Sequence, residues 1–170
     1  AFIGEGDDMK MILTDEYRLP IGCREIGSVA GLIDAKDYEA RVDIFQQKNV
    51  KAHCSPILFC GKNLASTATA ACRAAVREFK EETGMDFVPY EVSPDNLYSS
   101  AGMTNESVCL VIGKATGTTS KEFLEEHEDI NTMMLTRDEI VELMSRQEVA
   151  FSKYVWPFLW TIKHFGFPKF

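Results

Sequence analysis

The chain has 170 residues, a formal net charge of −8 and a pI near 4.9, and 45% of its residues are hydrophobic. This length suits a single domain, residues 1–170, with a hydrophobic core. The acidic balance argues against binding to a nucleic-acid backbone, which requires a basic face. No apolar run approaches the ~20 residues of a membrane span, so we expect no membrane association.

The cysteines and the first residues bear on the compartment. The five cysteines are an odd number without a paired spacing, which favours free thiols in a reducing environment. The first ten residues lack the basic and apolar regions of a secretory signal. We therefore expect a cytoplasmic protein.

The first third of the chain is predicted to contain short strands. Residues 9–14 alternate in polarity, which predicts a strand, and a turn is expected at 20–22. The apolar segment 28–34 is predicted to be a short buried strand. Residues 35–65 mix charged and apolar residues, and we interpret them as an excursion with one strand at 57–60.

A long helix follows this excursion. Ser66 or Thr67 is expected to cap its N-terminus, and the next residues are rich in alanine, arginine and glutamate, which are good helix formers. Gly84 stands where a left-handed residue commonly ends a helix.

Two strands, at 107–116 and 130–136, are predicted on either side of an acidic loop. Thr136 and Glu139 then form the pattern of a capping box at the start of a helix. The aromatic segment from Ser152 is expected to be the last helix, which Pro157 starts or kinks. Together these elements indicate an α/β fold, a sandwich with a mixed β-sheet.

Three carboxylates crowd one face near the end of the long helix. Glu78, Glu81 and Glu82 lie at positions i, i+3 and i+4. Like charges at this spacing each cost a few tenths of a kcal/mol, and the helix dipole disfavours anions there by roughly 0.3–1 kcal/mol. One interpretation is a solvated acidic face. The other is a site for a hard divalent cation, which prefers oxygen ligands.

The neighbouring residues resemble a known motif. The segment "REFKEETG", residues 77–84, matches the core of the Nudix box, R-E-hydrophobic-x-E-E-x-G. The chain therefore resembles the Nudix hydrolase superfamily. The resemblance implies an α/β/α sandwich and Mg²⁺- or Mn²⁺-dependent cleavage of a nucleoside diphosphate linked to another group.

Further segments resemble the ADP-ribose pyrophosphatase branch of this superfamily. They are "EYRLPIG" (16–22), "VAGLID" (29–34), "SSAGMTNESVCLVIGKATG" (99–117) and the acidic "EEHEDI" (125–130). The implied reaction is hydrolysis of ADP-ribose to AMP and ribose 5-phosphate. The alternatives are a UDP- or GDP-sugar pyrophosphatase and a non-catalytic nucleotide-binding module. Members of the branch are commonly domain-swapped dimers, so the resemblance also implies a homodimer.

The resemblance assigns metal-binding roles to the long helix and the segment 29–34. The carbonyl of Ala30 would hold the metals together with Glu78 and Glu82, and Glu81 would help to bridge them. Arg77 would pair with one of these carboxylates and orient it.

Substrate binding and proton transfer are assigned to other segments. Arg18 would bind the diphosphate, and Glu106 the ribose or adenosine. Glu128, or Glu126 if the register of the loop shifts, would be the general base. Arg18 as a surface cation and Glu128 as part of a solvated loop are the alternatives.

The box is interrupted in this chain. Counted from Gly31, the arginine is expected at position 45 and stands at Arg77, so 32 additional residues intervene. The box glutamate that braces the loop corresponds to Asp37 by one count and to Thr69 by the other. We hypothesise that residues 35–65 form a lid or specificity element over the active site.

Overall fold

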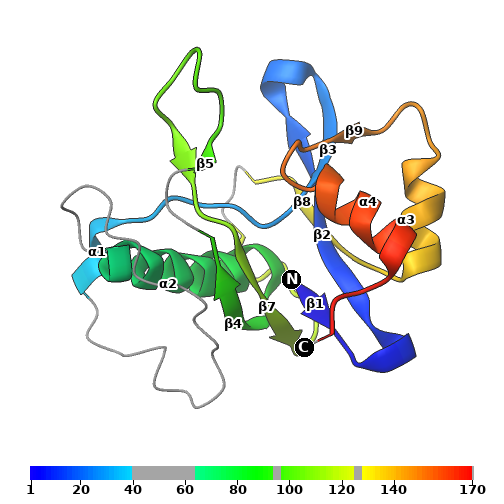
Figure 1. Cartoon of the computed structure of the whole chain (residues 1–170), viewed down its shortest axis with the longest axis horizontal. Coiled ribbons are helices and arrows are strands. Elements are labelled where there is room, and N and C mark those ends of the chain that lie inside the picture. Colours follow the sequence, from blue (N-terminus) through cyan, green and yellow to red (C-terminus); the bar gives the residue numbers. More distant parts are fainter. Residues whose placement is uncertain (40–63, 94–96, 125–127, 170) are drawn as a thin grey trace.

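A computed structural model describes residues 1–39, 64–93, 97–124 and 128–169 of the chain (Figure 1). These residues form a mixed α/β structure with a mixed sheet, as predicted. The hypothesised lid and the predicted strand at 57–60 fall mainly within residues 40–63, outside the described residues. Within the described ranges, none of the helices has both the length and the apolarity of a membrane span.

The main sheet has seven strands in the described residues. Its hydrogen-bonded order is β4 (Asp86–Val92), β7 (Val111–Thr116), β1 (Phe2–Ile3), β2 (Lys10–Arg18), β3 (Cys23–Gly27) and β9 (Ala150–Phe151), and β8 (Ile130–Leu135) pairs with β2. The pairs β1–β7 and β3–β9 are parallel, whereas the other pairs are antiparallel. A separate two-stranded hairpin consists of β5 (Leu97–Tyr98) and β6 (Ser107–Val108).

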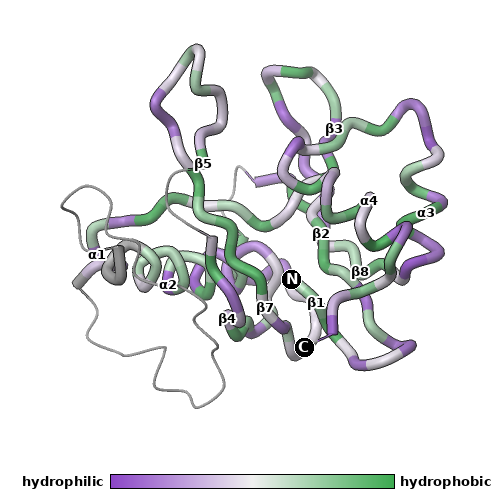
Figure 2. Tube along the Cα trace, in the orientation of Figure 1, coloured by the Kyte–Doolittle hydropathy of each residue, from purple (hydrophilic) through white to green (hydrophobic). Residues whose placement is uncertain are grey.

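Helices lie on both faces of the sheet. The described helices are α1 (Ala35–Glu39), α2 (Leu64–Thr83), α3 (Arg137–Met144) and α4 (Trp156–Phe165), with short 3-10 turns at Gly6–Asp8 and Leu19–Ile21. Figure 1 shows α2 on one side of the sheet and α3 and α4 on the other. The hydropathy colouring of Figure 2 shows hydrophobic residues along β7, between these layers.

Strand β2 separates the two halves of the core, because successive side chains of a strand point to opposite faces. Ile12 packs against Phe79 of α2 and Phe87 of β4. Leu13 packs on the other face with Ile140 of α3 and Leu159 of α4. All six side chains are buried, so β2 is the framework on which both helix layers assemble.

Three of the predicted helix signals are confirmed, and one is wrong. Gly84 follows α2 with a φ of 73°, the left-handed conformation expected there. Thr136 caps α3, and the reciprocal capping box with Glu139 is present. Pro157 lies in the first turn of α4. Helix α2, however, begins at Leu64, earlier than the predicted Ser66 or Thr67.

The prediction of a strand at 28–34 is wrong. Residues 28–34 have no regular secondary structure, and Leu32 is 80% exposed. Their backbone groups bind side chains instead of a neighbouring strand: the Ala30 amide donates to Glu82, and the Leu32 carbonyl accepts from Arg77. A strand pairing is thus replaced by contacts with α2.

The predicted strand at 107–116 is two strands, β6 and β7, with a break between Val108 and Val111. Strand β2 is longer than predicted and extends to Arg18. Strands β3 and β4 were not predicted from the sequence.

Candidate functional site

The core of the candidate site is the crossing of the segment Ala30–Gly31 over helix α2. The Ala30 amide donates a hydrogen bond of 3.2 Å to Glu82 Oε1. Gly31 lies directly against Glu78, since a Cβ atom built on Gly31 would be 1.9 Å from Glu78 Cδ. Only a glycine allows the backbone to approach this carboxylate so closely. The structure therefore brings Ala30, Glu78 and Glu82 together.

Glu82 is buried, with 7% of its surface exposed. Burial raises the pKa of Glu82 to about 8, against the opposing effect of the Ala30 hydrogen bond, and the negative charges of Glu16, Glu78 and Glu128 raise it further. A solvated acidic face does not describe this residue. Instead, Glu82 lies at the centre of a group of carboxylates, for which we use the name acidic cluster: Glu16, Glu78, Glu82 and Glu128.

Glu16 is the member of the acidic cluster that the sequence analysis missed. It follows Ile12 and Thr14 on the face of β2 that points towards α2. Burial raises the pKa of Glu16 above its ordinary value; Arg18 opposes this shift, and the charge of Glu128 adds to it. The alternation along β2 is the sequence signal that places Glu16 on this face.

Arg77 connects the carboxylates of the box. Its Nη1 atom donates to Glu78 Oε1 at 2.6 Å and to Glu81 Oε2 at 3.2 Å. Burial acts to lower the pKa of Arg77, but its hydrogen bonds with Glu78 and Asp37 raise the pKa above the ordinary value. The guanidinium therefore stays charged and orients Glu78.

Asp37, one of the two residues that the resemblance offers as the brace, forms an ion pair with Arg77. Its carboxylate is buried, with the residue 5% exposed. It accepts hydrogen bonds from the Asp34 amide at 2.8 Å and from Arg77 Nη2 at 3.3 Å. Arg73 donates to the Asp37 carbonyl at 2.8 Å. Asp37 thus links α1 to Arg73 and Arg77 of α2.

Glu81 differs from its two neighbours on the helix. Its side chain is 47% exposed, whereas that of Glu78 is 18% exposed. Burial raises the pKa of Glu78 above its ordinary value, and its hydrogen bond with Arg77 opposes this shift. The three box glutamates therefore run from a buried position at Glu82 to a solvent-facing one at Glu81.

Arg18 is linked to the acidic cluster through an ion pair. Its Nη2 atom lies 2.9 Å from Glu16 Oε2, and its Nε atom lies 3.4 Å from Glu25 Oε2. The side chain is 45% exposed. The predicted diphosphate-binding cation thus stands beside the carboxylates and is open to solvent.

Glu106 lies on the hairpin formed by β5 and β6. It accepts a hydrogen bond of 2.8 Å from Ser99 Oγ, and its amide donates to Thr104. Ser99 Oγ in turn accepts from the hydroxyl of Tyr154 at 2.6 Å. These contacts attach Glu106 to the segment before α4 and not to the acidic cluster.

Glu128, the predicted general base, lies two residues before β8. Glu128 is half-buried, and its charge raises the pKa values of Glu16 and Glu82. The alternative, Glu126, lies outside the described residues.

The oxygen atoms of the site are of the type that binds a hard cation. Glu78, Glu82 and the backbone of Ala30 present only oxygens as metal-binding atoms, the ligands that Mg²⁺ and Mn²⁺ prefer. Because Gly31 has no Cβ atom, the Glu78 carboxylate can lie directly against the backbone at this point. Among the described residues, however, no three or more His, Cys, Asp or Glu side chains are already arranged as a metal-binding group.

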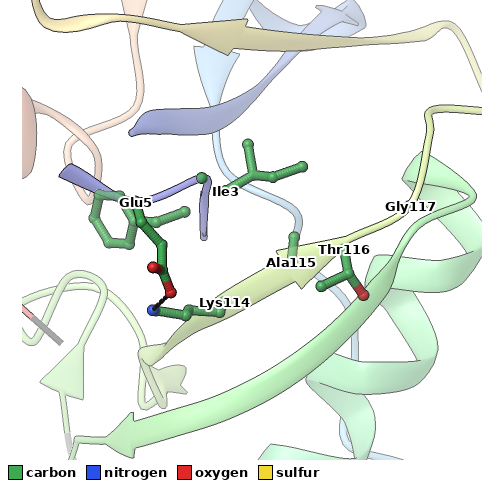
Figure 3. A pocket seen from close by; sticks show the side chains of 8 residues that line it. Ile3, Glu5, Lys114, Ala115, Thr116 and Gly117 are labelled. Carbon is green, nitrogen blue, oxygen red and sulfur yellow. Dashed lines mark hydrogen bonds and ion pairs between the residues drawn. The ribbon is translucent and has the colours of Figure 1, made fainter. Parts of the chain in front are cut away.

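A shallow pocket elsewhere in the structure involves other residues. It lies at the parallel pairing of β1 and β7, where the Glu5 and Lys114 side chains form an ion pair of 3.5 Å (Figure 3). None of the predicted site residues lines this pocket. We therefore assign no part of the predicted chemistry to it.

No protein-family model matches the chain, and the comparison with curated proteins found no match.

Proposed function

We propose that this chain is a Nudix-type hydrolase that cleaves the diphosphate bond of a nucleoside diphosphate-sugar with the help of Mg²⁺ or Mn²⁺. ADP-ribose is the leading substrate, and the products would be AMP and ribose 5-phosphate. The proposal rests on the box residues 77–84, on the four segments similar to the ADP-ribose pyrophosphatase branch, and on the geometry of the acidic cluster.

The observation that carries the proposal is the burial of Glu82 among other carboxylates. Burial and like charge both disfavour its ionised form. Proteins concentrate such perturbed carboxyl groups at functional sites. A divalent cation supplies positive charge that stabilises these carboxylates and neutralises a substrate diphosphate.

The residues of the chain have distinct roles in this proposal. Glu78, Glu82 and the Ala30 carbonyl hold the metal, and Glu81 assists from the solvent-facing side. Arg77 orients Glu78 through the 2.6 Å hydrogen bond. Arg18, placed beside the cluster by Glu16, binds the diphosphate with its planar group of donors.

Glu128 removes the proton from the attacking water. Its position two residues before β8 brings it close enough to Glu82 and Glu16 to raise their pKa values. A carboxylate placed beside the proposed metal-binding glutamates can accept the proton of an attacking water. Glu106, on its separate hairpin, contacts the nucleoside or sugar.

A substrate panel tests the proposal. ADP-ribose, other ADP-sugars, UDP-sugars and GDP-sugars are incubated with the chain and Mg²⁺, and the release of nucleoside monophosphate is measured. We expect turnover of ADP-ribose, and a loss of 100-fold or more in kcat for Glu82→Gln. Glu142→Gln is the matched control, since Glu142 is 69% exposed on α3 and pairs with Arg146.

Other outcomes would change the assignment. Turnover confined to a UDP- or GDP-sugar would keep the reaction and reject ADP-ribose. Tight binding of Mg²⁺ and nucleotide without turnover would indicate a non-catalytic binding module. Equal activity of the wild type and Glu82→Gln would reject the proposed site. The homodimer and the cytoplasmic location stay predictions.

A further inference from the structure

Arg24 of strand β3 connects three adjacent strands of the sheet. Its Nε atom donates to Asp15 Oδ1 at 2.9 Å, and its Nη2 atom donates to the Asp15 carbonyl at 2.6 Å. Its Nη1 atom reaches across β2 to Asp129 Oδ2 at 2.7 Å. Asp129 directly precedes β8, so a single guanidinium holds together β3, β2 and the start of β8.

These contacts lie on the face of the sheet that points away from the acidic cluster. Arg24 lies two residues before Ile26 in β3 and so shares its face, and Ile26 packs in the same core as Leu13, on the side of α3 and α4. Glu16 lies on the opposite face of β2, which it shares with Ile12, a residue that packs on α2. The hydrogen bonds of Arg24 are therefore with Asp15 and Asp129, and not with the carboxylates of the site.

Asp129 is the chain neighbour of Glu128, the proposed general base. The β2–β8 ladder ends at the pair Glu16 and Ile130. Beyond it, the backbone hydrogen bond from the Tyr17 amide to the Asp129 carbonyl is long, at 3.4 Å. The ion pair between Arg24 and Asp129 is much shorter, at 2.7 Å, and it holds Asp129 from the face of the sheet that carries α3 and α4.

From this geometry we propose that Arg24 is a positioning residue: by clamping Asp129 against β2, it holds the adjacent Glu128 carboxylate on the opposite face, next to Glu82. The proposal rests on the proposed hydrolase function, in which Glu128 is the base. Arg24 touches neither substrate nor metal in this scheme, and acts through the backbone between Asp129 and Glu128.

The planar guanidinium suits this task better than an ammonium group would. It donates from three nitrogen atoms to two residues at fixed angles, whereas lysine presents one compact group. The side chains of Arg24 and Asp129 are 35% and 65% exposed, and exposed ion pairs contribute little to overall stability. Substitution of Arg24 should therefore leave the fold intact and disturb mainly the position of Glu128.

Kinetics of Arg24→Gln, Arg24→Lys, Asp129→Asn and the double variant Arg24→Gln/Asp129→Asn test the proposal. We expect kcat to fall by about 10- to 100-fold in Arg24→Gln with KM within about twofold, because a displaced base slows chemistry without weakening binding. Arg24→Lys should restore only part of the loss. The double variant should lose no more than Arg24→Gln alone, because both changes remove the same contact.

A second readout does not depend on turnover. Amide hydrogen exchange of residues 128–131 in the full chain should be faster in Arg24→Gln and Asp129→Asn than in the wild type, and unchanged in Arg146→Gln. Arg146 pairs with Glu142 on α3 and serves as the matched control. If the wild type turns over no nucleotide-sugar, the proposed function fails, and exchange alone decides whether the clamp exists.

Several results would overturn the role of Arg24. Unchanged exchange in Arg24→Gln would show that Arg24 does not fix this segment. A rise in KM with unchanged kcat would show that Arg24 binds substrate. Full activity of Arg24→Lys would show that charge alone matters, and an equal loss in Arg146→Gln would show that the effect is unspecific.

Discussion

Asp37 and Arg77 form an ion pair of 3.3 Å although they are 40 positions apart in the chain. The pair joins the first helix to the helix that carries the box glutamates. Because Arg77 also binds Glu78, this ion pair, which we call the brace, connects the position of α1 to the orientation of a proposed metal ligand.

We expect Asp37→Ala to destabilise the chain by about 1–3 kcal/mol, because it removes the buried acceptor of the Asp34 amide and of Arg77. Thermal or urea unfolding measures this change. Asp86→Asn is the control, since Asp86 pairs with Lys80 at the surface and its side chain is 73% exposed. Equal stability of Asp37→Ala and the wild type would show that the brace is not needed.

Gly31→Ala should separate activity from stability. The new Cβ would collide with the carboxyl group of Glu78, and this flexible side chain can move away at little cost to the fold. We expect kcat and the affinity for Mg²⁺ to fall by about 10- to 100-fold, with the melting temperature nearly unchanged. Gly27→Ala is the control, because its Cβ would make only ordinary contacts, the nearest at 3.5 Å from Thr14. Similar kinetics of both variants would contradict this prediction.

The raised pKa of Glu82 makes stability depend on pH. The folded-state pKa is about 8 and the ordinary value is 4.5, so the folded chain binds more protons than the unfolded chain between these values. The free energy of unfolding should therefore fall as pH rises through this window, by at most about 1.4 kcal/mol per pH unit from this group.

Urea unfolding in EDTA at several pH values from 5 to 8 measures this dependence. Glu82→Gln cannot ionise and should show a smaller decrease with rising pH than the wild type. Added Mg²⁺ should stabilise the wild type more at high pH, because it binds the ionised carboxylates. Parallel curves for the wild type and Glu82→Gln would exclude Glu82 as the cause.

Gly84→Ala tests how α2 is joined to the following loop. Its φ of 73° is strained for alanine, and the Cβ would lie 2.7 Å from the Ser120 amide nitrogen. Gly6 has a similar φ of 56° but no atom within 4 Å of the added Cβ. We expect Gly84→Ala to lose about 1–3 kcal/mol more stability than Gly6→Ala, as measured by urea unfolding. Equal losses of stability in the two variants would mean that Ser120 moves aside without destabilising the fold.

Local signals in the sequence predicted the parts of the fold that depend on near neighbours. Gly84 ends α2, and Thr136 with Glu139 starts α3, because each of these caps is formed by residues within a few positions. The shared helical face of Glu78 and Glu82 likewise follows from their spacing alone.

The remaining features depend on contacts between distant segments. The apolar residues 28–34 resemble a strand, but Glu82 and Arg77 take up their backbone groups. Glu16 joins the acidic cluster only because β2 lies against α2. Strand β4 was missed because Pro89 is unfavourable in most strands; it is tolerated here at the edge of the sheet, next to an irregularity in the pairing with β7.

The short strand β1 has a mechanical consequence. In the described sheet it is the hydrogen-bonded connection between β4–β7 and the strands around β2, and it contributes only two residues. Helix α2 spans this seam, since Phe79 packs against Ile12 on one side and Phe87 on the other. A small rotation of one half of the sheet against the other would thus change the distances from the glutamates of α2 to Glu16 and Glu128. In the proposed site, such a rotation would change the affinity for the metal ion.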